Sequence, residues 1–258
     1  MTSTAELQRL LEAAKNDVRA EEAFLAGLLS ATVYAHVPRT PPPTGKMQFV
    51  QFVRPDNGQT VLPFFSDQAK AQFAGRGRVG IVSMAGRRLL ELTQGATLML
   101  NPNDDGYVLY PEEVSALLTD RPLGIFVAEQ TTPGETVGLA APSVPVDALV
   151  NALAGYLGKE PAVQAGYLME LHRGKDLADV SLLIALVVLS KEAERIARGS
   201  MVAAQPVLQS LTLPLLIMCH TPEEPLPPGY EEAICFYGNP GHASSRIGIS
   251  QEGGGDSA

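Results

Sequence analysis

Between Asp120 and Pro145 the helical periodicity of the chain stops, and Pro and Gly recur at short intervals. Such a stretch favours an extended connection, because Pro cannot continue a helix and Gly weakens a strand interior. At about 150 residues per domain, a chain of 258 residues has room for one large domain or two small ones. We therefore predict two domains at 1–120 and 136–248, joined by a linker at 121–135 and followed by a disordered tail at 249–258.

The charge balance limits the partners that the chain can bind. Asp and Glu number 28 against 19 Lys and Arg, which gives a net charge of −9. An acidic chain repels phosphate backbones, so we expect no binding of nucleic acid or of anionic membranes. Two Cys make no disulfide framework, and the longest apolar run, Val180–Leu189, is shorter than the roughly 20 residues of a spanning helix. With no secretory signal at its start, the chain is expected in the cytoplasm.

The first half mixes short helical and strand patterns. Apolar residues at Leu7, Leu10, Leu11 and Ala14 have the spacing of one helix face. Asn57-Gly58 lies between two apolar runs, which predicts a hairpin. The predicted strands are 32–34, 47–53, 60–64, 79–82 and 97–100, and the predicted later helices are 67–73, 89–92 and 111–118. The predicted fold class is α+β.

The second half has a different order of elements. Strands are expected at 136–140, 162–171, 180–189 and 212–218, with helices at 146–156 and 191–204. This β-α-β-β-α-β order matches a ferredoxin-like sheet. A further strand at 233–237 would extend that sheet.

A family resemblance rests on four stretches of the first half. They are Phe24-Leu25-x-x-Leu28-Leu29 before Val33-Tyr34, then Val61 to Asp67, Leu98 to Pro102, and Tyr110 to Glu113. These stretches resemble the N-terminal domain of the enhanced serine sensitivity (SseB) family. The motif positions are Pro63, Phe64, Asn101, Pro102 and Glu112.

The second half resembles the C-terminal domain of the same family more loosely. The matching stretches are Val137 to Pro142, Val163 to Leu168 and Ile234 to Tyr237, so that the resemblance covers about residues 5 to 240. It implies no enzymatic activity and no cofactor. The family name implies a phenotype connected with serine, and no reaction.

The stretch from Asn101 to Gly106, followed by Glu112, has the spacing of an EF-hand calcium loop. Three features oppose that interpretation: the first position is Asn, the ninth is Leu109, and a strand is predicted before the loop. The alternative is a polar turn between strands in which Gly106 supplies a positive φ. We expect no tight binding of a divalent metal.

Arginines gather in one part of this acidic chain, at Arg76, Arg78, Arg87 and Arg88. The surrounding Gly75 to Gly80 has the letters of a dinucleotide fingerprint, but it follows a predicted helix and leads into a strand, the reverse of the required order. Two interpretations of the arginines remain. They are either solvated side chains lying over apolar neighbours, or a docking surface for an acidic partner.

Candidate nucleophiles are few. Cys219 and His220 are adjacent on a predicted strand, so their side chains point to opposite faces. Cys219 and Cys235 are expected as small core residues on two strands, and a zinc site is poorly supported. No Gly-x-Ser-x-Gly, P-loop or His-Glu-x-x-His motif occurs.

The sequence therefore favours a non-enzymatic binding or regulatory protein that presents a sheet face or cleft to a protein or a small metabolite. No cofactor is expected. The alternative is an enzyme that acts on an amino acid or its derivative in a cleft between the domains.

Overall fold

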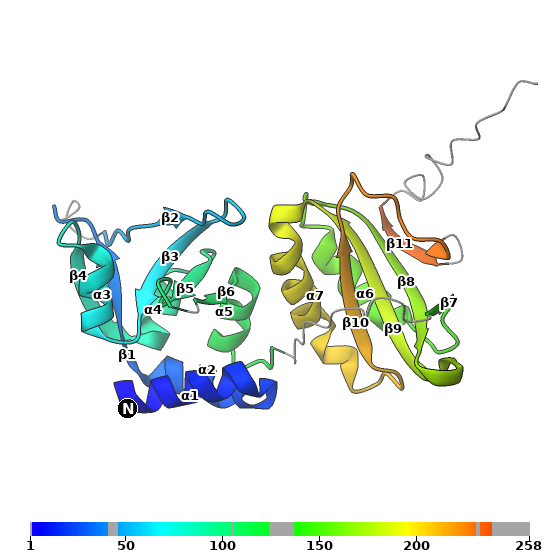
Figure 1. Ribbon diagram of the computed structural model, residues 1–258, viewed down its shortest axis with the longest axis horizontal. Helices are drawn as coiled ribbons and strands as arrows, with labels where there is room; N and C mark the ends of the chain where they lie inside the picture. Colours follow the sequence, from blue (N-terminus) through cyan, green and yellow to red (C-terminus); the bar gives the residue numbers. More distant parts are fainter. Residues whose placement is uncertain (1, 41–45, 105, 124–136, 231–232, 239–258) are drawn as a thin grey trace, which may run out of the picture. The chain divides into compact units, whose positions relative to one another are not determined.

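The computed structural model describes residues 2–40, 46–104, 106–123, 137–230 and 233–238. The chain forms two compact units, residues 1–130 with 194–205 and residues 131–193 with 206–258 (Figure 1). Most of the predicted linker at 121–135 and all of the predicted tail at 249–258 lie outside the described residues. The predicted domain limits therefore stay a prediction. Among the described residues, no helix has both the length and the apolar character needed to cross a membrane.

The first unit is a mixed sheet with helices packed on it. Its strands are β1 (Thr32–Val37), β2 (Phe52–Val53), β3 (Thr60–Phe65), β4 (Gly80–Ala85), β5 (Leu98–Leu100) and β6 (Tyr107–Leu109). Its helices are α1 (Thr4–Asn16), the 3-10 turn Val18–Ala20, α2 (Glu21–Ser30), α3 (Gln68–Gly75), α4 (Gly86–Leu92) and α5 (Pro111–Leu118). The strand order is β4-β1-β3-β5-β6, with β2 paired to β3.

The apolar faces of α1, α2 and α4 form the core of this unit together with the sheet. Leu7, Phe24, Phe64, Leu89 and Leu98 are each at most 1% exposed in that core. The helix α4 begins at Gly86, where an added Cβ would clash with the carbonyl of Leu28 at the end of α2. Only glycine permits this approach of the chain to α2.

Two details of the first unit differ from the sequence prediction. The predicted strand 47–53 is wrong over most of its length, because β3 pairs with β1 through Phe64 and Phe65 and leaves only its first residues for β2. The strand β6 was not predicted, and it pairs antiparallel with β5 across a polar turn. Gly106 in that turn has a φ of 41°, as the turn interpretation required. The hairpin at Asn57-Gly58 and the helix at 111–118 are confirmed.

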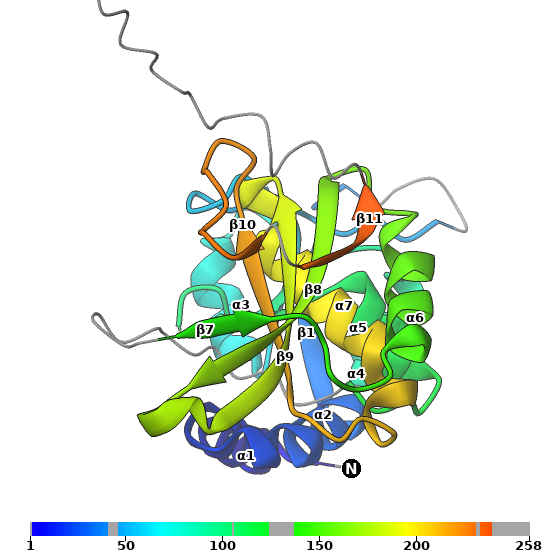
Figure 2. The same cartoon turned by 90° about the vertical axis from the view of Figure 1, so that its right-hand side faces the viewer.

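The second unit contains β7 (Gly138–Ala140), α6 (Asp147–Leu157), β8 (Val163–Arg173), β9 (Asp179–Val188), β10 (Leu215–His220) and β11 (Ile234–Gly238). The helix α7 (Ala193–Leu208) runs between β9 and β10 in the sequence, and its residues 194–205 belong to the first unit. The strand order is β10-β9-β8-β11, with β7 paired to β8, and Figure 2 shows α6 beside this sheet.

The predicted ferredoxin-like arrangement of this sheet is not confirmed. That arrangement is built from βαβ units, whose two strands are parallel. The strands β9 and β10 are parallel across α7, but they are direct neighbours, whereas a split βαβ unit has another strand between its two parallel strands. In addition, β7 pairs antiparallel with β8, although α6 lies between them in the sequence. The α+β class is correct, and the detailed topology is not.

Candidate functional site

Two strand ends in the first unit bring together residues that lie 35 positions apart. The strands β3 and β5 are parallel neighbours, so Ser66 and Asn101 follow their carboxyl ends at the same edge of the sheet. The Ser66 amide donates to Asn101 Oδ1 at 3.0 Å, and Asn101 Nδ2 donates to the Ser66 hydroxyl at 3.1 Å. Both residues are buried, at 1% and 3% exposure. The hydrogen bonds between Ser66 and Asn101 therefore hold together the loops that follow β3 and β5, and so support the exposed side chains that these loops carry.

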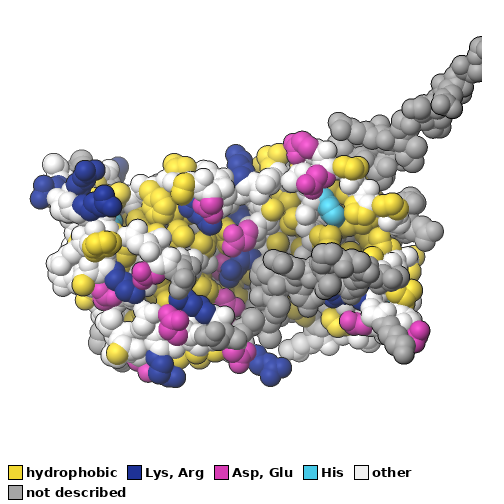
Figure 3. Space-filling model, in the orientation of Figure 1, with side chains coloured by type: hydrophobic (Ala, Val, Ile, Leu, Met, Phe, Trp, Pro, Cys, Tyr) yellow, Lys and Arg dark blue, Asp and Glu magenta, His cyan; other side chains and the backbone are white. Residues whose placement is uncertain are grey.

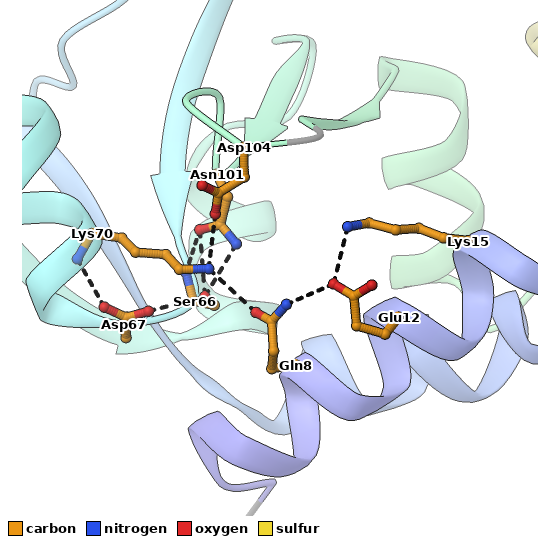
Figure 4. Close-up of polar contacts among 8 residues, drawn as sticks. All are labelled: Gln8, Glu12, Lys15, Ser66, Asp67, Lys70, Asn101 and Asp104. Atoms are coloured by element: carbon orange, nitrogen blue, oxygen red, sulfur yellow. Dashed lines mark hydrogen bonds and ion pairs between the residues drawn. The ribbon is translucent and has the colours of Figure 1, made fainter.

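The helix α3 starts from the first of these loops. The Asp67 carboxylate caps it by accepting from the Lys70 amide at 2.8 Å. The Lys70 side chain turns to the second loop, where its Nζ lies 2.9 Å from Asp104 Oδ2 (Figure 4). The same ammonium donates to Gln8 Oε1 at 3.3 Å. Lys70 thus connects α3, the β5–β6 turn and α1.

The helix α1 contributes three polar side chains to this series of contacts. Gln8, Glu12 and Lys15 lie at positions i, i+4 and i+7 and so share one face of the helix. Gln8 Nε2 donates to Glu12 Oε1 at 2.9 Å, and Lys15 Nζ lies 3.0 Å from the same oxygen. Figure 4 shows these side chains in one row that leads to Lys70. The row combines ammonium, amide and carboxylate groups.

Two pockets flank the Lys70–Asp104 pair. The polar pocket has a volume of about 340 Å³ and is lined by Gln8, Leu11, Glu12, Lys15, Leu100, Asn101, Asp104, Gly106 and Tyr107. The apolar pocket has about 310 Å³ and is lined by Phe65, Ala69, Lys70, Phe73, Asn101, Asn103 and Asp104. Asn101 and Asp104 border both. We call the two pockets together the Lys70 groove.

The groove is open to solvent. The side chains of Lys70 and Asp104 are 34% and 48% exposed, and Phe73 on the wall of the apolar pocket is 74% exposed. An ion pair at such exposure contributes about 0.2–1 kcal/mol, so a ligand can displace it at small cost. The arrangement offers one cation, one anion and an uncovered aromatic ring to the same ligand.

A second polar cluster in the first unit is largely buried, in contrast with the exposed Lys70 groove. Glu113, 3% exposed, accepts from the Tyr110 amide at 2.9 Å and from Arg198 Nε at 2.6 Å. Burial raises the pKa of the Glu113 carboxyl, and Arg198 opposes that shift. Arg198 also lies 3.6 Å from Glu21, which is hydrogen-bonded to the Tyr107 hydroxyl. These groups satisfy one another, so we interpret the cluster as structural.

The residues of the SseB resemblance fall into three places. Pro63 and Phe64 lie in the buried strand β3 beneath the groove, and Asn101 and Pro102 begin the turn that carries Asp104. Glu112 lies apart, in the first turn of α5, and accepts from Arg195 Nη1 at 3.1 Å. Of the five motif positions, only Asn101 thus lines the groove itself.

The described oxygen positions of the calcium-loop pattern, Asn101, Asn103 and Glu112, have different surroundings. Asn101 bonds to Ser66, Asn103 lines the apolar pocket, and Glu112 bonds to Arg195. Asp105 lies outside the described residues. Among the residues that are described, no three His, Cys, Asp or Glu side chains form a group that could hold a metal ion.

The four predicted arginines occupy the two ends of β4. Arg76 and Arg78 precede this strand and are exposed, whereas Arg87 and Arg88 follow it. Six residues of strand span roughly 17–20 Å, so the two pairs lie well apart at opposite ends of β4. Arg87 lies 3.2 Å from Asp120, and Arg88 lies 3.2 Å from Glu91.

The two cysteines and His220 lie in the second unit. Cys219 and Cys235 are free thiols on β10 and β11, which are separated by β9 and β8. Burial raises the pKa of the Cys219 thiol to about 11, so it is not an activated nucleophile. His220 Nε2 lies 2.7 Å from the Tyr230 hydroxyl.

Sequence reasoning missed most of the groove. Lys70, Gln8 and Phe73 carry no motif, and Asp104 was considered only as part of a metal loop. The one available signal was the pair of motifs that end β3 and begin the β5–β6 turn, because both contribute residues to the groove.

A comparison with known protein families finds a match in the first unit. Residues 7–116 match the family described as SseB protein N-terminal domain. Protein SseB of Escherichia coli (strain K12) is 27% identical over 187 residues, which is 70% of this chain and 71% of that protein. Protein SseB of Shigella flexneri matches with the same figures. No solved structure matches the chain significantly. Residues 7–116 of the first unit therefore match the SseB protein N-terminal domain, and the chain is similar to Protein SseB over 70% of its length.

Proposed function

We propose that the chain is a non-enzymatic binding protein of the cytoplasm, and that its Lys70 groove receives an extended segment of a partner protein. The observation that carries the proposal is Phe73, which is 74% exposed on the wall of the apolar pocket. Burying a Phe side chain contributes about 1.5–3 kcal/mol. A partner that covers Phe73 gains this free energy on binding.

The polar groups of the groove suit a peptide backbone. The Lys70 ammonium donates hydrogen bonds, and the Asp104 carboxylate accepts them. An extended peptide supplies both carbonyl and amide groups along its length, and its successive side chains point to opposite sides. One side chain can therefore enter the apolar pocket while polar groups face Gln8, Glu12 and Lys15.

The buried Ser66 hydroxyl is placed for support of the groove and not for catalysis. Ser66 is 1% exposed, and its hydroxyl is hydrogen-bonded to the Asn101 amide. A serine nucleophile must instead reach its substrate and be activated by an adjacent base. Ser66 positions the loops, and the exposed groups above it make the contacts.

The test is a selection of peptides from a random display library on the purified full chain, followed by fluorescence anisotropy. We expect selected peptides to bind at least tenfold more weakly to Phe73→Ser. Met47→Ser serves as the matched control, because Met47 is 52% exposed and lines neither pocket. Selected peptides that bind Phe73→Ser as well as the unchanged protein would contradict the proposal. So would a library that yields no peptide.

A further inference from the structure

Three arginines meet at one corner of the first unit, and one of them was not singled out by sequence. The β1–β4 ladder ends with the pair Val37–Gly80. Arg39 and Arg78 each lie two residues beyond that pair, on the two adjoining chains. Arg76 ends α3 just before Arg78. We call Arg39, Arg76 and Arg78 the arginine corner.

Among the described residues, no carboxylate lies within ion-pair distance of a member of this corner. All three are exposed, and within the described part of the chain none of their side chains forms a hydrogen bond or an ion pair. By contrast, two other exposed arginines of the same unit are paired, Arg9 with Glu6 and Arg88 with Glu91. Figure 3 shows Lys and Arg side chains gathered where α3 leads into β4, with the carboxylates of this unit elsewhere on that face.

The arginine corner is positively charged, whereas the protein as a whole is negatively charged. The net charge of the chain is −9, so three unpaired cations at one place form a local reversal of sign. Like charges placed side by side repel, and the repulsion is relieved when an anionic partner binds. The free protein therefore holds a site that is complementary to carboxylates.

An apolar anchor adjoins the corner. Phe73 lies in the last turn of α3, three residues before Arg76 in the chain. Contact surfaces with high affinity often combine a buried aromatic side chain with arginines around it. We propose that the arginine corner binds the carboxylates of an acidic protein segment, one apolar side chain of which covers Phe73. This inference rests on the proposed function of the Lys70 groove and names the chemistry of the partner.

An acidic protein segment fits better than other polyanions. Membrane recognition by charge uses clusters of about 4–8 Lys or Arg, more than the corner holds. A nucleic acid extends far beyond three phosphates, and its remaining charge would meet the acidic surface of this chain. A short segment of Asp and Glu with one apolar residue meets only the corner and Phe73.

The probe is a fluorescein-labelled peptide of twelve residues in which Asp and Glu surround one central Leu. Its binding to the full chain is measured by anisotropy at 50 mM NaCl. We expect Arg76→Glu with Arg78→Glu to raise the Kd at least tenfold. The matched control is Arg87→Glu with Arg88→Glu, which makes the same charge change at the other end of β4 and should alter the Kd less than twofold. Thermal melting of both variants verifies that they are folded.

Two further binding measurements, one at high salt and one with an uncharged peptide, test whether charge drives the interaction. Because exposed charges are screened over about 3–10 Å between 1 M and 0.1 M salt, binding should weaken strongly at 500 mM NaCl. The same peptide with Gln and Asn in place of Glu and Asp should bind at least tenfold more weakly. Equal binding of the two peptides would overturn the inference. Equal weakening by both arginine pairs would also overturn it, because it would show only a general effect of charge.

The remaining outcomes separate this inference from the proposed function. If Phe73→Ala releases the peptide but Arg76→Glu with Arg78→Glu does not, the inference is wrong and the groove proposal stands. If the arginine variant releases it but Phe73→Ala does not, the arginine contact is supported and the groove proposal is wrong. Tighter binding of a 20-nucleotide single-stranded DNA at the same arginines would replace the protein segment with a nucleic acid and overturn the inference.

Discussion

The two units use their strands in opposite ways. In the second unit, β9 is buried without a break from Ser181 to Val188, so both of its faces are covered. In the first unit, the ends of β3 and β5 lead into loops whose Lys70, Phe73 and Asp104 side chains remain accessible. The strand β9 thus devotes its side chains to packing. The first sheet keeps charged and aromatic groups available, and this contrast places the candidate site in the first unit.

The largest expected effect lies in the second unit. Ile184 on β9 is fully buried and faces partners on both neighbouring strands. Ile184→Ala removes its packing and leaves a cavity, so we expect a loss of about 2–5 kcal/mol in the free energy of unfolding. Urea denaturation followed by circular dichroism measures it. Met218→Ala on the adjacent β10 is the control, because Met218 is 36% exposed and should cost much less.

The second-largest expected effect is a loss of stability at Asn101, which supports the Lys70 groove in the first unit. Asn101→Ala removes its side-chain hydrogen bonds to Ser66, each worth about 0.5–1.5 kcal/mol, at a position where φ is 48°. Such a φ costs a residue other than Gly or Asn about 1 kcal/mol or more. We expect a loss of about 2–3 kcal/mol by chemical denaturation. Asn101→Gly should lose less, because glycine accepts this φ and loses only the hydrogen bonds.

Exposed Asn103 is the control for this position, since it lines the apolar pocket without taking part in the Ser66 contacts. Asn103→Ala should change the free energy of unfolding by under about 0.5 kcal/mol. Equal effects of Asn101→Ala and Asn103→Ala would show that the amide does not hold the two loops together.

These residues also show how far sequence reasoning extends. Local signals predicted the Asn57-Gly58 hairpin and the helix from Pro111, because turn and cap residues act on their immediate neighbours. They did not predict β6 or the antiparallel pairing of β7, which depend on strands distant in the sequence. The Lys70–Asp104 pair was missed for the same reason, since the parallel pairing of β3 with β5 creates it.

A smaller effect is expected at Glu170 in the second unit. This buried carboxylate accepts from the Ser143 amide at 2.7 Å and from its hydroxyl at 2.6 Å. Burial alone would raise the pKa of the Glu170 carboxyl, but the hydrogen bonds from Ser143 and the neighbouring His172 outweigh burial and hold this pKa below its ordinary value. A lowered pKa stabilises the fold above the unfolded-state pKa, and this contribution is lost as the pH falls through the folded-state value.

Glu170→Gln should therefore cost about 1 kcal/mol at pH 7, where it weakens charge-assisted hydrogen bonds. The difference from the unchanged protein should shrink as the pH falls through the lowered pKa of Glu170. Urea denaturation between pH 3 and pH 7 measures both. A constant difference across that range would show that the charge of Glu170 does not contribute.

The smallest expected effect is a gain in stability at the arginine corner. Arg76 ends α3 with a φ of 45°, a position where helices prefer glycine. Arg76→Gly relieves about 1–2 kcal/mol of unfavourable conformation, but the greater freedom of glycine in the unfolded chain returns roughly half of it. We expect a net gain of about 0.5–1 kcal/mol, visible as a rise of a few degrees in the melting temperature. The same change removes one cation from the corner, so the acidic peptide should bind several-fold more weakly. A gain in stability with unchanged peptide binding would mean that Arg76 is not part of the docking surface, and that Arg39 and Arg78 bind the carboxylates without it.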